Sequence, residues 1–100
     1  MIEAVREALC EMGHDEAVVF DNPDFDEAII GATEDGRAVY EYDTMVKCLA
    51  EKAGISELEA MEFIDYNTIR VIPYAGEHAP IIVYSIKPYL PGGTVEKLKE

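Results

Sequence analysis

The sequence has little positive charge. Its 8 lysines and arginines stand against 21 aspartates and glutamates, and the formal net charge is -13 at pH 7. Nucleic-acid affinity depends on basic side chains that displace counterions from phosphates, so direct binding to nucleic acid or to an anionic membrane is disfavoured. The same charge favours basic protein partners, including proteins that normally hold nucleic acid.

Cysteine and long apolar runs are also scarce. Cys10 and Cys48 fit the spacing of no zinc or redox motif, which predicts two reduced thiols rather than a disulfide framework. No apolar run approaches the ~20 residues that cross a bilayer. The N-terminal residues lack the basic segment, apolar run and cleavage site of a signal peptide. We therefore expect a soluble, cytoplasmic protein with no membrane segment.

The composition is that of a globular protein, with 49% hydrophobic and 29% charged residues. A chain of 100 residues has material for one core. We expect a single α+β domain over residues 1–86. A loosely held tail, rich in proline and glycine, is expected over residues 87–100.

Two helices are expected on either side of the predicted hairpin. Residues 2–12 have the apolar periodicity of an amphipathic helix, and Gly13 is the expected C-terminal stop. A second helix should begin with Asp43 as its cap, run to residue 53 and end at Gly54.

A third helix is expected from residue 57 to about residue 68. Ser56 and Glu59 have the spacing of a capping box, which marks its start. Asn67 falls on the expected apolar face, where a buried amide needs a hydrogen-bond partner. We expect Asn67 to hold the turn from Pro73 to Gly76. The side chains expected on the apolar face also include Ala60, Met61, Phe63 and Ile64.

Four strands are expected. Residues 17–20 form a short apolar run typical of a buried strand. Residues 28–33 and 37–42 predict a hairpin around Asp35 and Gly36, the dipeptide of a two-residue type I′ turn, with Gly31 facing Tyr40. Residues 80–86 predict a final strand.

The predicted fold class is α+β. The elements should follow the order helix, three-strand antiparallel meander, two helices and final strand, with the helices packed on one sheet face.

Several segments of the second half resemble a known group of sequences: Gly54-Ile55-Ser56, Glu59 to Phe63, Asp65-Tyr66-Asn67, and Pro73 to Glu77 with Ala79 to Ile82. The pattern is similar to that of short acidic hypothetical proteins from bacteria, their phages and mobile elements. That group has no established activity. The resemblance therefore implies a cytoplasmic accessory protein and assigns no catalytic residue.

No stretch has the pattern of a nucleophile constellation, a metal cluster or a phosphate loop. The acidic segment 21–27 lacks the glycine and the final bidentate glutamate of a calcium loop, so we interpret it as a solvated loop. His14 and His78 are isolated in sequence. We expect no catalytic residue, cofactor or metal.

Residues 49–56 resemble the first helix and turn of a helix-turn-helix. The following helix would bring four carboxylates to the DNA, which argues against this function.

Two functional hypotheses remain. The first is a small non-enzymatic accessory protein that self-associates or binds another protein through an exposed apolar patch. Its test is whether Tyr66, Tyr74, Tyr84 and Tyr89 share a surface. The alternative is an acidic inhibitor or nucleic-acid mimic that docks a basic host defence or replication protein. The candidate interaction residues are Asp21, Asp24, Asp26, Glu27, Glu57, Glu59, Glu62 and Asp65. The expected structural residues are Ser56, Asn67, Gly36, Gly54, Pro73 and Gly76.

Overall fold

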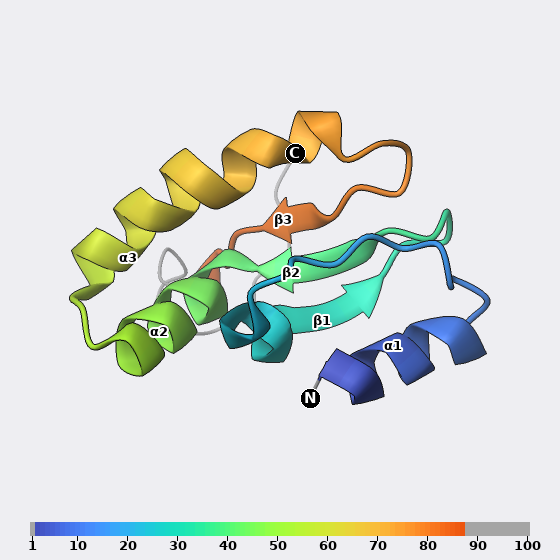
Figure 1. The fold of residues 1–100 in the computed structure, drawn as a ribbon, viewed down its shortest axis with the longest axis horizontal. Coiled ribbons are helices and arrows are strands. Elements are labelled where there is room, and N and C mark those ends of the chain that lie inside the picture. The colour runs from blue at the N-terminus through green and yellow to red at the C-terminus, as the bar shows by residue number, and fades with distance from the viewer. Residues whose placement is uncertain (1, 88–100) are drawn as a thin grey trace, which may run out of the picture.

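The computed structural model describes residues 2–87, so the predicted tail lies, from residue 88 onward, outside the described residues. It has an α+β fold with a three-stranded sheet (Figure 1). Within the described part of the chain, no helix is long and apolar enough to cross a membrane. The elements in chain order are α1 (Ile2–Glu11), the 3-10 helix η1 (Pro23–Ala28), β1 (Ile29–Ala32), β2 (Ala38–Glu41), α2 (Tyr42–Ala53), α3 (Glu57–Phe63), the π-helical turn η2 (Ile64–Thr68), the 3-10 helix η3 (Ile69–Tyr74) and β3 (Ile81–Val83).

The sheet is mixed, with strand order β1-β2-β3. β1 and β2 are antiparallel, but β3 lies parallel to β2, with Val39 opposite Ile81 and Tyr40 opposite Ile82. The predicted antiparallel meander is therefore wrong. β2 runs directly into α2, and the helical segment up to Tyr74 is long enough to return the chain to the start of β2, which is the crossover that a parallel pair needs.

The turn between β1 and β2 has three residues instead of the predicted two. The amide of Thr33 donates to the carbonyl of Arg37 at 2.8 Å, and Gly36 has a φ of 88°. A type I′ turn would also need a positive φ at Asp35, yet no described residue other than glycine has one. The Thr33 hydroxyl bonds instead to the Asp35 carboxylate. The register consequently shifts by one, so that Gly31 faces Val39 instead of Tyr40. A further irregularity between Ile29 and Gly31 places Tyr40 opposite Ile29.

Residues 17–20 are not a strand, which is a further correction. The amide of Val18 donates to the carbonyl of His78 at 3.1 Å, but the amide of Phe20 donates to the side-chain hydroxyl of Tyr40 at 2.9 Å. A side chain takes the place of the backbone partner, so no ladder forms in this segment.

The C-terminal ends of the first two helices follow the sequence closely, but the predicted cap of α2 is wrong. Glu41 is the N-cap of α2, and Asp43 lies in its first turn. α1 ends just before Gly13, and α2 ends at Gly54, whose φ of 70° is the left-handed cap conformation. The capping box of α3 is confirmed, because the Ser56 hydroxyl accepts from the Glu59 amide while the Glu59 carboxylate accepts from the Ser56 amide, both at 3.1 Å.

The buried face of the third helix is narrower than predicted. Ala60, Ile64 and Thr68 are buried, at a spacing of four residues, whereas Met61 and Phe63 are exposed. Because Ala60 is small, α3 packs on α2 through this single stripe, and the larger side chains on either side of it face solvent. Placing Met61 and Phe63 in the core was wrong.

Two predicted structural roles near the end of this helix are also wrong. Asn67 is exposed, and its side-chain amide donates to the carbonyl of Phe63 at 3.2 Å, within the helix, so it does not hold the following turn. Pro73 lies inside η3, and the turn itself is displaced to Gly76, which has a φ of 94°. The amide of Ala79 closes this turn on the carbonyl of Gly76.

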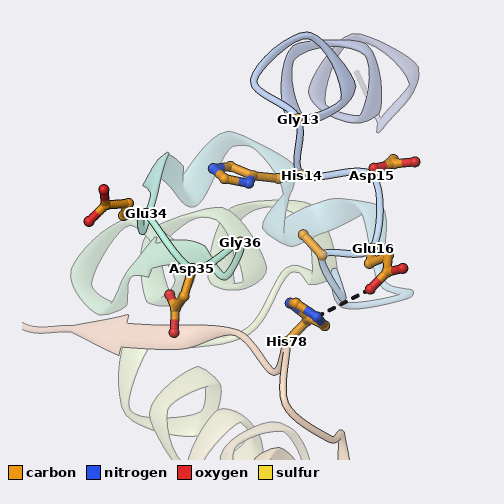
Figure 2. Close-up of a pocket in the computed structure, with 9 residues that line it drawn as sticks. Gly13, His14, Asp15, Glu16, Glu34, Asp35, Gly36 and His78 are labelled. Atoms are coloured by element: carbon orange, nitrogen blue, oxygen red, sulfur yellow. Dashed lines mark ion pairs between the residues drawn. The ribbon is translucent and has the colours of Figure 1, made fainter.

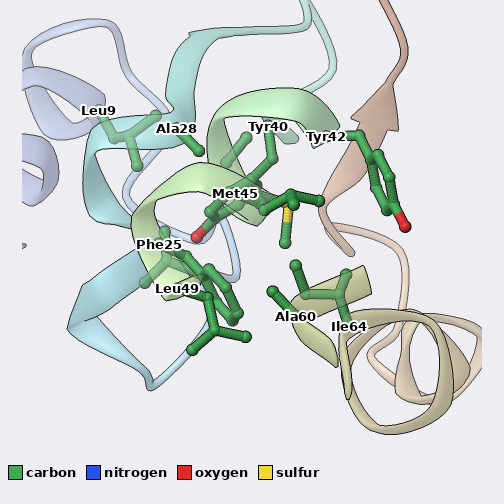
Figure 3. Close-up of a cluster of buried hydrophobic side chains, with 12 residues drawn as sticks. Leu9, Phe25, Ala28, Tyr40, Tyr42, Met45, Leu49, Ala60 and Ile64 are labelled. Carbon is green, nitrogen blue, oxygen red and sulfur yellow. The ribbon is translucent and has the colours of Figure 1, made fainter. Parts of the chain in front are cut away.

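The core lies around α2. Its side chains pack on η1 and on the third helix, with Met45 lying between Phe25 and Ile64 (Figure 3). Tyr40 is fully buried beneath this layer, and its ring lies 4.7 Å from that of Phe20. η1 and α3 both pack against α2. The acidic segment 21–27 includes η1, and the acidic segment 57–65 includes α3.

Candidate functional site

The acidic segment 21–27 is not an open loop. Asn22 caps η1 by accepting from the Asp24 amide at 2.9 Å, and Pro23 occupies its first turn. The short helix turns Phe25 and Asp26 inward, and Asp26 is only 2% exposed. Asp26 therefore cannot belong to the predicted interaction surface. Asp21 and Glu27 are exposed, and Asp24 is half-buried.

Asp26 is an unusual buried carboxylate. No described group donates a hydrogen bond to either of its oxygens. Burial raises the pKa of Asp26, while the positive charges of Lys52 and Arg6 act in the opposite direction. Nearby, Glu27 accepts a hydrogen bond from the buried Cys48 thiol at 3.6 Å; burial, followed by this bond, raises the pKa of Cys48. A thiol with a raised pKa is a weak nucleophile at neutral pH.

The acidic residues of the third helix do lie on the surface. Glu57, Glu59, Glu62 and Asp65 are all exposed. The two acidic segments lie on different helical elements, η1 and α3, each of which packs on α2. An open hollow of about 620 Å³ lies on this helical surface. Its lining residues are Glu59, Glu62, Phe63, Asp65, Tyr66 and Asn67.

We call the surface formed by Glu59, Glu62, Phe63, Asp65 and Tyr66 the acidic-aromatic face. Two of its three carboxylates accept hydrogen bonds from other groups of the protein. Glu59 is fixed by the capping box at Ser56. Oδ1 of Asp65 accepts a hydrogen bond from the buried Tyr42 hydroxyl at 2.9 Å. Glu59 and Asp65 are therefore positioned before any ligand arrives.

The aromatic side chains of this region are exposed. Phe63 is 45% exposed and Tyr66 is 70% exposed. The guanidinium of Arg70 lies over the Tyr66 ring, 4.9 Å from its centroid. Large exposed rings beside a hollow mark a surface suited to an interface.

Tyr66, Tyr74 and Tyr84, three of the four tyrosines expected to mark an interface, are all exposed. Tyr84 is 59% exposed, and its ring packs on Tyr42 at 4.8 Å, so it adjoins the side chain that holds Asp65. Tyr74 is 88% exposed on η3. Tyr89 lies outside the described residues.

A second hollow, of about 350 Å³, lies at the hairpin turn (Figure 2). Gly36 lies between the rings of His14 and His78, and a Cβ at this position would be 3.4 Å and 3.3 Å from their Nδ1 atoms. Nε2 of His78 pairs with Glu16 at 3.3 Å, while its Nδ1 is buried with no described partner. The two histidines, which are isolated from each other in the sequence, therefore both lie beside Gly36 in the fold.

No sequence signal predicted this second hollow. The histidines come from segments far apart in the chain, and only the tertiary fold brings them together at the turn. The other ionisable side chains that line the hollow are acidic: Asp15, Glu16, Glu34 and Asp35. A hydrogen bond from Thr33 lowers the pKa of Asp35. Over residues 2–87, no group of three or more His, Cys, Asp or Glu side chains is arranged to hold a metal ion.

Comparison with protein-family models, with curated proteins and with solved structures finds no match for this chain. Its function must therefore be argued from its own surfaces.

Proposed function

We propose that this chain is a non-enzymatic, cytoplasmic accessory protein whose acidic-aromatic face docks a basic segment of a partner protein. The single observation that carries the proposal is the hollow on the third helix, where exposed Phe63 and Tyr66 lie among three carboxylates. Buried aromatic side chains supply much of the affinity of protein interfaces. Charge complementarity steers the partner and fixes its orientation.

The charge of the chain favours a basic partner over a second copy. Two copies would each carry a formal charge of -13, and their acidic faces would repel each other. A segment rich in lysine and arginine removes this repulsion. The partner class suggested by the resemblance in the sequence is a basic host defence or replication protein that the chain would inhibit.

An inhibitor of this kind would bind its partner through Glu59, Glu62 and Asp65, and not through the acidic residues of η1. Asp26 is buried, and η1 and α3 are different elements that each pack on α2. We therefore do not propose that the two segments form one continuous row of phosphate-like charges. Docking relies instead on a compact face in which ring contacts accompany the charges.

The test is a pull-down with the tagged protein from bacterial lysate at low and raised salt, read by mass spectrometry. A triple variant, Glu59→Gln, Glu62→Gln and Asp65→Asn, should lose a basic partner that the wild type recovers at low salt. Glutamine at position 59 still completes a capping box, so the helix start is kept. The matched control, Glu7→Gln, Glu11→Gln and Asp21→Asn, removes the same charge from exposed positions elsewhere and should recover the partner. Equal recovery by the two triple variants would overturn the proposed face.

A further inference from the structure

The contact between Arg70 and Tyr66 shows what the acidic-aromatic face can bind. The Arg70 guanidinium lies 4.9 Å from the centroid of the Tyr66 ring, within the distance of a cation-π interaction. The two residues are four positions apart, Tyr66 on η2 and Arg70 on the adjoining η3, so no distant part of the chain is needed to bring Arg70 to the ring. The ring remains 70% exposed despite this contact. A guanidinium is thus already accommodated at the edge of the hollow.

The carboxylates of the hollow suit the same group. Asp65 is held by the Tyr42 hydroxyl and Glu59 by the capping box, while Glu62 lines the same hollow. A guanidinium is planar, binds a carboxylate through two parallel N–H groups and stacks on an aromatic face. The lysine ammonium is a compact, strongly hydrated charge that lacks the planar geometry. An aromatic ring beside positioned carboxylates therefore discriminates between the two basic side chains.

We infer that the acidic-aromatic face recognises an arginine side chain of the partner, which stacks on Tyr66 beside Glu62 and Asp65. The inference rests on the proposed function and specifies the chemistry of the partner. Arg70 is the internal occupant of the ring in the free protein, so the partner's arginine competes with it. Removal of Arg70 should consequently strengthen arginine binding.

The experiment uses two fluorescent helical peptides of equal length and charge in an alanine-glutamine background, one carrying arginines and the other lysines. Binding is followed by fluorescence anisotropy at low salt. We expect the wild type to bind the arginine peptide about 5-fold more tightly than the lysine peptide. Tyr66→Leu should remove this preference, and Tyr66→Phe should keep it because the ring is retained.

Arg70→Ala should increase the preference for arginine. The matched control is Lys52→Ala, which removes the same charge from an exposed position of α2 near Asp26. It should strengthen the binding of both peptides equally, because it lowers the positive charge of the protein without lining the acidic-aromatic face.

Two results would overturn the inference. Equal affinity for the two peptides, abolished by the Glu59, Glu62 and Asp65 triple variant, would refute arginine recognition and leave the proposed function standing. Binding of neither peptide would also refute arginine recognition, and the pull-down with the two triple variants would then decide the proposed function by itself.

Discussion

The hydroxyl of Tyr42 donates a hydrogen bond to Oδ1 of Asp65 across 2.9 Å, and this bond joins the core to the acidic-aromatic face. Tyr42 opens α2 and is 7% exposed, whereas Asp65 lies on the surface of η2. Burial, followed by the bond to Asp65, raises the pKa of Tyr42, so the phenol stays protonated and continues to donate. The orientation of a surface carboxylate is thereby set by a residue of the core.

Tyr42→Phe keeps the ring and removes this donor. We expect the free energy of unfolding to fall by about 1 kcal/mol, the usual net contribution of such a bond, as measured by urea denaturation. The affinity for the arginine peptide should fall as well, because Asp65 is no longer positioned. Tyr74→Phe is the matched control, since Tyr74 is 88% exposed and no described group bonds to its hydroxyl. Unchanged stability of Tyr42→Phe would show that the bond contributes nothing.

Asp26→Asn should stabilise the protein at neutral pH. Burial raises the pKa of Asp26 above its unfolded value, so the folded state binds this proton more tightly than the unfolded state does. The stabilisation by the protonated form is complete below the unfolded pKa and is lost as the pH rises through the folded pKa. At about pH 7 the amide removes an unpaired buried charge, which we expect to raise the free energy of unfolding by about 1 kcal/mol.

The measurement is the urea midpoint of wild type and Asp26→Asn between about pH 7 and pH 4. The advantage of the variant should shrink as the pH is lowered toward the unfolded value near 3.9. Asp21→Asn removes the same charge from an exposed position before η1 and should change stability by less than about 0.5 kcal/mol. An advantage that stays constant with pH would contradict ionisation of Asp26 as the cause.

Features that depend on short sequence spacing could be predicted. The capping box at Ser56 and the helix end at Gly54 each rest on backbone groups within four residues, and both are present. The acidic surface of α3 and η2 likewise follows from helical periodicity, and Glu59, Glu62 and Asp65 are exposed.

Features that depend on distant partners could not be predicted in this way. The direction of β3 is set by the crossover through the helices, and the hydroxyl of Tyr40 replaces the strand partner of Phe20. The absence of a calcium-loop pattern predicts that segment 21–27 is a solvated loop, but the position of Phe25 in the core turns Asp26 inward with it. The positions of His14 and His78 beside Gly36 also result only from the tertiary fold.

Gly36→Ala should destabilise the protein more than Gly54→Ala. Both glycines have a positive φ, of 88° and 70°, so alanine is strained by roughly 1–2 kcal/mol at either position. At Gly36 the new methyl group would also meet the two histidine rings at 3.3–3.4 Å, whereas nothing lies within 4 Å at Gly54. The free energies of unfolding of the two variants are measured by urea denaturation. The extra loss in Gly36→Ala is the contribution of the contact with the histidine rings. Equal losses would show that the rings move aside freely.

We expect the protein to lose stability in alkali because of the buried Tyr40 hydroxyl. Burial raises the pKa of Tyr40 from 10.0 to about 12, and its hydroxyl oxygen accepts the Phe20 amide at 2.9 Å. The folded state therefore keeps this proton when the unfolded state releases it. Its contribution to stability is complete below about pH 10 and is lost between about pH 10 and 12.

Tyr40→Phe separates this effect from other alkaline effects. At about pH 8 the variant should lose about 1 kcal/mol, because the Phe20 amide no longer has its acceptor. Between about pH 9 and pH 11 its free energy of unfolding should fall less steeply than that of the wild type, since one titrating group is gone. Tyr66→Phe, which removes an exposed hydroxyl, should keep the wild-type slope. Parallel slopes for wild type and Tyr40→Phe would mean that Tyr40 ionises equally in the folded and unfolded states, in conflict with its complete burial.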